Sequence, residues 1–163
     1  MRSRYADQLL LLTVFSCVAG LAIALISQHV FEMLPCAWCV FQRVLICVIG
    51  VLALLALLAR SWRRSSSSLA GVAAIVSLGG MVSAIYQNQV AAKLDSCDQT
   101  FADRFMMGSG LDANFPSVFG IWASCADAKV DLLGVSYDIW ALLLFALLAV
   151  MTAVAAGLRF NSR

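Results

Sequence analysis

The chain has 163 residues, of which 63% are hydrophobic and only 12% are charged. Water-soluble domains average roughly 45–50% apolar and about 25% charged residues, so this composition excludes an ordinary soluble domain and indicates a membrane protein. The net charge of +2 comes with no cluster of basic and aromatic residues, which argues against nucleic acid as a partner.

Four apolar stretches predict membrane-spanning helices. They cover residues 9–27, 40–59, 69–86 and 139–158. Each is about 18 to 20 residues long, enough for a helix rising about 1.5 Å per residue to cross a hydrocarbon core of about 30 Å. We therefore predict an all-α membrane protein in which residues 1–163 form one four-helix bundle.

The first stretch has an alternative interpretation as a cleaved signal peptide. Arg2 and Arg4 precede it, and Ala22-Ile23-Ala24 is similar to a cleavage site. The apolar run, however, exceeds the roughly 7–15 residues of a signal peptide's hydrophobic region and continues past that site. We favour a retained first helix.

The basic residues predict the orientation of the helices, because cytoplasmic loops hold an excess of Lys and Arg near the helix ends. Seven of the eleven basic residues fall in segments 1–8, 60–68 and 159–163, which we assign to the cytoplasm. Both termini are therefore expected to be cytoplasmic. Segments 28–39 and 87–138, which hold most acidic residues, are expected on the outer side.

The outer segment 87–138 is unusually long for a connection without a function. Its part from Asp95 to Gly110 is polar and contains Gly108-Ser109-Gly110, so we expect it to be mobile. The part from Phe115 to Trp122 is apolar and aromatic but too short to span, and it predicts a short helix in the membrane interface.

Six cysteines carry the chemical information of this sequence. Cys36, Cys39, Cys97 and Cys125 fall on the predicted outer side, where an oxidising compartment favours disulfides over free thiols. Cys36 and Cys39 form one local pair, a C-x-x-C motif, and Cys97 and Cys125 on the long segment form the other.

Other interpretations of the cysteines are a structural zinc site and a pair of purely structural disulfides. Zinc is disfavoured because Cys97 and Cys125 are separated by 27 residues and His29 is the only histidine. Cys17 and Cys47 fall inside predicted helices, where a free cysteine behaves as a small, inert hydrophobe.

The residues around the C-x-x-C motif favour a redox role for it over a purely structural disulfide. Pro35 precedes Cys36 where the second helix begins, and proline's missing N–H costs nothing there. A helix N-terminus favours a thiolate, which lowers a cysteine pKa. Arg43 follows Cys39 by four residues, so both side chains share one helix face.

Polar residues are predicted at the same depth in the membrane as the C-x-x-C motif. An arginine inside a span is costly unless it reaches the interface, and Gln28 and His29 end the first helix nearby. An apolar pocket with a few polar groups beside a thiolate suits a hydrophobic electron acceptor, and a lipid-soluble quinone is the obvious candidate.

Taken together, these motifs resemble the DsbB family over nearly the whole chain. The resemblance is carried by Gln28-His29-Val30, Pro35-Cys36-x-x-Cys39, Arg43, the outer cysteine pair and Asp131-Leu132-Leu133-Gly134. It implies a bacterial inner-membrane enzyme that accepts electrons from a reduced thioredoxin-like periplasmic oxidant of the DsbA type and passes them to ubiquinone or menaquinone.

The resemblance also implies roles for the cysteines. Cys97 would form a mixed disulfide with the partner, and Cys125 would be its mate. Exchange through a transient Cys36–Cys125 bridge would free Cys39 as the thiolate that meets the quinone ring beside Arg43. Gln28 and His29 would add polar groups to the quinone site.

The third helix departs from the best-known members of the family, which have a histidine soon after a tyrosine. Here Tyr86 is followed by Gln87, Asn88 and Gln89, so the role of Asn88 as a quinone contact stays open. Two rival functions are a vitamin K epoxide reductase-like enzyme, disfavoured by the order of its cysteines, and a non-catalytic scaffold with structural disulfides.

Overall fold

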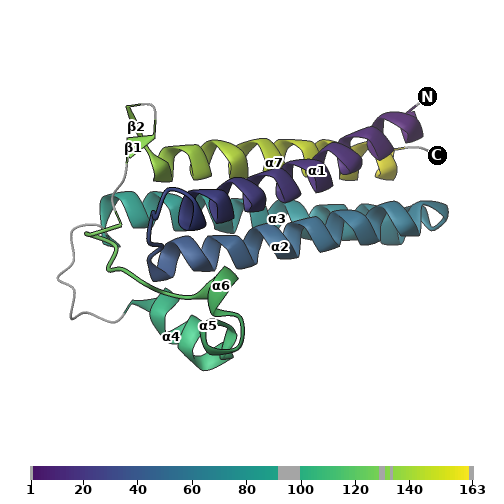
Figure 1. The fold of residues 1–163 in the computed structure, drawn as a ribbon. Coiled ribbons are helices and arrows are strands. Elements are labelled where there is room, and N and C mark those ends of the chain that lie inside the picture. The colour runs from purple at the N-terminus through teal and green to yellow at the C-terminus, as the bar shows by residue number, and fades with distance from the viewer. Residues whose placement is uncertain (1, 92–99, 129–130, 133, 162–163) are drawn as a thin grey trace.

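Four long helices form the computed structural model, which describes residues 2–91, 100–128, 131–132 and 134–161 (Figure 1). They are α1 (Arg2–His29), α2 (Ala37–Leu58), α3 (Arg63–Gln89) and α7 (Tyr137–Phe160). All four are long and apolar enough to cross a membrane, so the predicted four-helix membrane bundle is confirmed. Helices α1, α3 and α7 run beyond their apolar stretches at both ends, whereas α2 begins three residues before its stretch and ends one residue early, where η1 follows.

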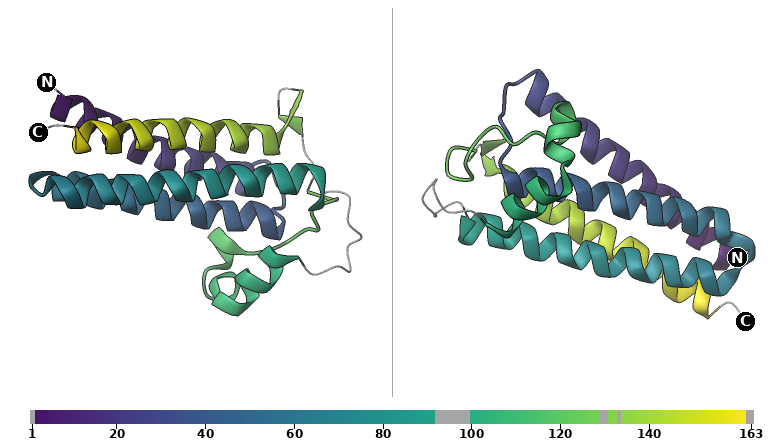
Figure 2. Two further views of the ribbon diagram at one scale, coloured as in Figure 1. Left: turned by 180° about the vertical axis from the view of Figure 1, so that it is seen from behind. Right: turned by 90° about the horizontal axis from the view of Figure 1, so that it is seen from below.

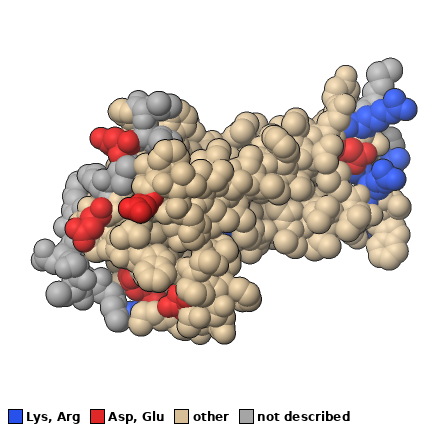
Figure 3. All heavy atoms as spheres, viewed as in Figure 1, with Lys and Arg blue, Asp and Glu red and all other residues tan. Residues whose placement is uncertain are grey.

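The helices pack antiparallel as a ring in which α1 contacts α2, α2 contacts α3, α3 contacts α7, and α7 contacts α1. The short 3₁₀ helix η1 (Ala59–Ser61) joins α2 to α3. Both described chain ends lie at this same end of the bundle (Figure 1). Charge divides along the bundle axis, because Lys and Arg gather at that end and most Asp and Glu at the other (Figure 3).

Small residues bring the helices close together. A fully buried cluster joins Ala53 and Ala56 of α2 to Ala70 of α3 and Ala155 of α7. Gly80 of α3 lies against the Phe145 ring of α7, and a Cβ at position 80 would stand 2.3 Å from that ring. Helices in membranes pack in this way because lipid supplies no hydrophobic driving force between them.

The outward surfaces of the helices are apolar, as lipid contact requires. Large hydrophobic side chains on all four helices are exposed, among them Phe15, Val18, Val51, Leu54, Ile75, Val82, Leu147 and Val150. In water such a surface would aggregate, so the fold fits a bilayer and not a soluble bundle.

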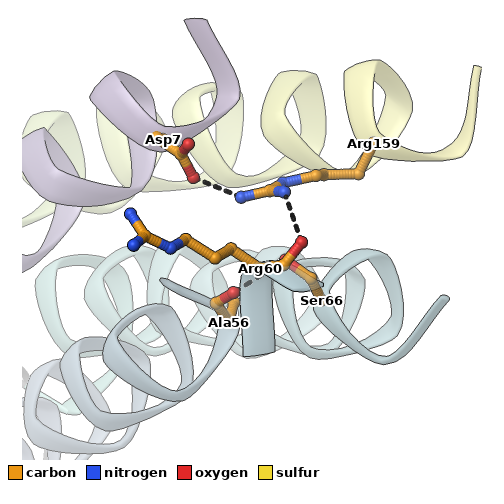
Figure 4. A network of polar contacts seen from close by, with 5 residues as sticks. All are labelled: Asp7, Ala56, Arg60, Ser66 and Arg159. Atoms are coloured by element: carbon orange, nitrogen blue, oxygen red, sulfur yellow. Dashed lines mark hydrogen bonds and ion pairs between the residues drawn. The ribbon is translucent and has the colours of Figure 1, made fainter. Parts of the chain in front are cut away.

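A buried arginine holds the basic end of the bundle together (Figure 4). Arg159 of α7 forms an ion pair with Asp7 of α1 and donates to the carbonyl oxygen of Arg60 at 3.2 Å. Nearby, the Ser66 hydroxyl donates to the carbonyl oxygen of Ala56 at 2.7 Å. These contacts link all four long helices or their connections.

Three short helices in the described part of the outer segment lie outside the ring, the first and third of them against α2 and the second between those two (Figure 2). They are α4 (Phe101–Ser109), α5 (Leu111–Asn114) and α6 (Pro116–Phe119). A small antiparallel pair, β1 (Asp131–Leu132) and β2 (Val135–Ser136), then leads into α7.

The stretch from Asp95 to Gly110, which was expected to bury little apolar surface, forms a helix in its described part, residues 100–110. Helix α4 buries Ala102 and Met106 completely. The Asp103 carboxylate accepts the Thr100 backbone N–H at 2.8 Å and so caps the helix, and Gly110 ends it in the left-handed conformation. Residues 95–99 lie outside the described part of the chain.

Candidate redox site

The C-x-x-C motif stands at the start of α2. Cys36 is the N-cap residue, with extended backbone, and Ala37 is the first helical residue. Pro35 therefore lies before the helix and not within its first turn, and its carbonyl oxygen accepts the Trp122 backbone N–H at 3.0 Å. This bond fixes the chain after α6 against the motif.

Three described sulfur atoms meet at Cys36. Its side chain is fully buried and lies 3.2 Å, sulfur to sulfur, from Cys39. Cys125 packs against the buried cluster that contains Cys36, close enough for the two thiols to interact. Cys97, the expected mate of Cys125, lies outside the described residues.

Proton positions follow from these contacts. The hydrogen bonds of Cys36 with Cys125 and with Cys39, together with burial, raise the pKa of the Cys36 thiol well above its usual range. Cys36 therefore keeps its proton, and its single S–H can donate to Cys39 or to Cys125. The expected lowering of a thiol pKa at the helix N-terminus does not apply to Cys36.

Cys39 faces a chain of amide and carboxylate groups. Gln87 of α3 donates from Nε2 to the Cys39 sulfur at 3.2 Å and to Asp138 Oδ1 at 2.6 Å. Gln42 of α2 donates from Nε2 to Gln87 Oε1 at 2.7 Å. Asn88 donates to Asp138 Oδ2 at 3.4 Å. Cys39 thus receives a hydrogen bond from Gln87 and lies within hydrogen-bond reach of the Cys36 thiol, an environment that favours a thiolate.

Arg43 is buried one turn after Cys39 and holds the outer segment. Its Nη1 donates to Gln28 Oε1 at 2.5 Å and to the Val118 carbonyl oxygen at 2.7 Å, and its Nη2 donates to the Ala24 carbonyl oxygen at 3.3 Å. None of the hydrogen bonds described for Arg43 goes to Cys39. Its charge acts on Cys39 through space.

Gln28 and His29 hold the residue before Val118. Gln28 Nε2 donates to the Ser117 carbonyl oxygen at 3.4 Å, and His29 Nε2 lies 2.8 Å from the same oxygen. Gln28 is buried, whereas His29 is exposed. Both residues therefore fix α6 over the site, which is a role that the sequence did not predict.

An apolar cleft of about 580 Å³ opens beside Cys39. Polar side chains line one end, where Cys39, Gln42, Arg43, Gln87 and Asp138 meet. The walls are mainly apolar side chains of α1 and α7: Phe15, Ala19, Ile23, Trp140, Leu143, Leu144 and Leu147. Such a cleft suits a long apolar molecule with a polar head.

The structure gathers most of the predicted site residues. Cys39 and Arg43 line the cleft, and Cys36 and Gln28 touch them directly. Asn88 is connected to the site through Asp138, and His29 contacts the Ser117 carbonyl oxygen. Among the residues that the structure describes, no group of three or more His, Cys, Asp or Glu is placed to hold a metal ion.

Sequence reasoning missed Gln42, Gln87 and Asp138. Gln42 follows Cys39 by three residues and so shares its helix face, which is a signal that could have been used. Gln87 and Asp138 come from distant helices, and no local spacing connects them with Cys39. Cys17 and Cys47 do not line the cleft, and Cys17 belongs to the apolar core.

Known proteins match nearly the whole chain. A family model described as "Disulfide bond formation protein DsbB" matches residues 6–155. "Disulfide bond formation protein B" of Nitrosomonas eutropha is 26% identical over 158 residues, covering 95% of this chain and 98% of that protein. "Disulfide bond formation protein B 1" of Burkholderia lata is 30% identical over 156 residues, covering 95% and 90%. The similarly named protein of Pseudomonas syringae is 30% identical over 149 residues, covering 91% and 88%.

Proposed function

This chain belongs to the DsbB family of disulfide bond formation proteins, and on that basis we propose that it passes electrons from a periplasmic thiol protein to a membrane quinone. The electron donor is a thioredoxin-like oxidant of the DsbA type in its reduced form. The electron acceptor is ubiquinone or menaquinone.

One observation carries the proposal: Cys36 is shared between Cys125 of the outer segment and Cys39 of the cleft. Thiol–disulfide exchange needs the attacking and attacked sulfur atoms side by side. A buried sulfur with a neighbour on each side can pass a disulfide from the outer pair to the inner pair. A structural brace needs no such third sulfur.

The proposed relay conserves electrons at each step. The partner's two thiols become a disulfide, while the Cys97–Cys125 bond is reduced to two thiols. Cys125 then attacks Cys36, which forms a Cys36–Cys125 bond and releases Cys39 as a thiolate. Attack of Cys97 on Cys125 restores the outer disulfide and leaves Cys36 and Cys39 reduced.

The residues around the cleft fit a quinone. When bound, the quinone supplies an oxidant that accepts two electrons and two protons. The cleft's polar end would hold the head group beside Cys39, with Arg43 as the positive charge, and the apolar walls would hold the isoprenoid chain. The carbonyl contacts of Arg43 keep its guanidinium at this depth in the membrane.

We further propose that the protein lies in the bacterial inner membrane with its redox site toward the periplasm. The basic residues of the end that holds the termini support cytoplasmic placement of that end. The three described site cysteines lie at the start of α2 and in the outer segment packed against it, at the opposite end of the bundle (Figure 1), where Asp and Glu gather (Figure 3) and where a periplasmic partner could reach the outer segment.

Trapping a mixed disulfide tests the donor side. A DsbA-like protein that keeps only its attacking active-site cysteine should form a stable adduct with the wild-type protein on a non-reducing gel. Cys97→Ala should abolish this adduct, because it removes the sulfur that the partner attacks. Cys47→Ala is the matched control and should trap as the wild type does.

The two negative outcomes have different meanings. An adduct of wild-type yield in Cys97→Ala would refute the role of Cys97 and leave the acceptor side standing. A wild-type protein that forms no adduct with a DsbA-like partner would overturn the proposed electron donor.

A further inference from the structure

Asp138 is a carboxylic acid at a position where a negative charge is energetically unfavourable. It is buried in the first turn of α7, inside a membrane-spanning helix, where a charge costs free energy unless polar groups surround it. Among the described residues that line the cleft, it is the only carboxylic acid. Neither the hydrophobic core nor the disulfide relay requires an acid at this position.

The orientation of the Gln87 amide connects Asp138 to the reactive sulfur. Gln42 donates to Gln87 Oε1, so the Gln87 amide nitrogen must point the other way. That nitrogen has two hydrogen atoms, and both are used, one toward Cys39 at 3.2 Å and one toward Asp138 at 2.6 Å. The Cys39 sulfur and the Asp138 carboxylate therefore lie around one donor.

Their charges compete in this site. The other titratable or charged groups on the cleft are Arg43 of α2 and Tyr137 of α7, and the Cys36 thiol adjoins Cys39. The cleft residues of α1 carry no ionisable side chain, and α3 contributes only the neutral Gln87. A thiolate and a carboxylate this close repel each other across a medium of low dielectric constant, with one arginine to offset them.

We propose that Asp138 is the proton-transfer residue of this site. In the reduced site Cys39 is a thiolate, and the Asp138 carboxylate holds the proton that completes the reduced Cys36–Cys39 pair. The resulting acid gives that proton to a quinone oxygen. This inference rests on the proposed function. It adds a residue that acts on both sides of the reaction, since the proton it holds beside the thiolate is the one that reaches the quinone oxygen.

Atoms and electrons balance over the step. Cys36 and Cys39 form a disulfide bond and lose two electrons and two protons. The quinone takes up both electrons and is reduced to the quinol. One of these protons is held on Asp138 and passes from it to the quinone, the other comes from the Cys36 thiol, and Asp138 ends as the carboxylate with which it began.

A structural role would look similar in a static picture, because an acid in the first turn of a helix is favourable to the helix dipole. The two roles differ in what they do to Cys39. A residue that only stabilises α7 does not change when Cys39 ionises, whereas a residue that shares its proton does.

The first test follows Cys39 alone in quinone-free, reduced protein. Its alkylation by iodoacetamide is measured against pH by peptide mass spectrometry. Asp138→Asn should move the midpoint of this profile to lower pH by about one unit or more, because it removes the competing negative charge. Asp138→Glu should stay near the wild type, as should the matched control Asp131→Asn, which changes an exposed acid in β1.

The second test uses turnover with a soluble quinone. Asp138→Asn should lower kcat by about 100-fold or more with little change in KM, and added acetate should restore part of the rate. Asp138→Glu should retain most of the rate. Glu keeps the carboxyl group, so its behaviour separates proton transfer from misfolding.

The outcomes are distinguishable. If the pH profile of Cys39 alkylation and the kcat of Asp138→Asn both match those of the wild type, this proposal is overturned and the proposed function stands. A loss of kcat in Asp138→Asn with an unmoved Cys39 profile and no rescue by acetate would assign Asp138 a structural role and also overturn it. A wild-type protein that reduces no quinone would overturn the proposed function and this proposal with it.

Discussion

Arg43 joins the redox helix to the outer segment through a single guanidinium. Its three hydrogen-bond acceptors are Gln28 Oε1 and the carbonyl oxygens of Val118 and Ala24. The planar guanidinium of arginine can donate hydrogen bonds to acceptors on several sides at once, whereas the ammonium of a lysine, on a shorter side chain, cannot reach all three. Arg43 therefore positions α6 and also places a positive charge at the polar end of the cleft.

Replacing Arg43 with lysine keeps the charge and removes the planar guanidinium. We expect Arg43→Lys to raise KM for a soluble quinone about tenfold, because losing one hydrogen bond to a charged group costs about 1.5–3 kcal/mol. Steady-state kinetics measure this. Arg104→Lys, on the exposed face of α4, is the matched control and should leave KM unchanged. An unchanged KM in Arg43→Lys would refute the positioning role.

At the residue scale, the sequence predicted groups that are close along the chain. Cys36, Cys39 and Arg43 lie at the N-cap and within the first two turns of α2, so helical periodicity predicted that they are neighbours. Gln87 and Asp138 could not be found in this way, because they meet Cys39 only through packing of α3 and α7. An acid in a first turn also has a common explanation in the helix dipole, which conceals a chemical role.

Helix α3 packs so closely against α7 at Gly80 that there is no room for a side chain at this position. Gly80→Ala would put a Cβ 2.3 Å from the Phe145 ring. We expect this variant to lower the thermal midpoint in detergent, with a cost of about 1–3 kcal/mol for overpacking.

The adjacent glycine provides the control for this experiment. A Cβ on Gly79 meets nothing within 4 Å, so Gly79→Ala should leave the midpoint unchanged or raise it slightly. Equal midpoints for Gly80→Ala and the wild type would contradict the close α3–α7 contact.

At the element scale, hydropathy was sufficient for the four long helices, because length and apolarity are what a bilayer requires. It failed for α4, whose polar composition concealed two buried residues, Ala102 and Met106. The readable signal was Thr100 followed three residues later by Asp103, a helix-capping pattern. The small apolar face of α4 acquires its partner only when Phe41 of α2 packs on Phe105, with ring centroids 5.2 Å apart.

At the scale of the whole molecule, the distribution of basic residues predicted that both chain ends and the connection between the second and third helices share one side. Both described chain ends lie at that basic end of the bundle (Figures 1 and 3). The cyclic order of the helices was not predictable, since four apolar helices of similar length can pack in several orders. That order decides the site, because α1 and α7 form the walls of the cleft while α2 and α3 contribute Cys39 and Gln87.

The most direct test of the account is electron stoichiometry in the complete protein. Purified protein in detergent with quinone is mixed anaerobically with a reduced DsbA-like substrate, and quinone absorbance is followed against thiol titre. We predict one quinone reduced for each pair of thiols lost, no reduction by Cys39→Ala, and normal reduction by Cys47→Ala. Inert thiols and an unchanged quinone spectrum in the wild type would contradict the relay and favour a braced membrane scaffold.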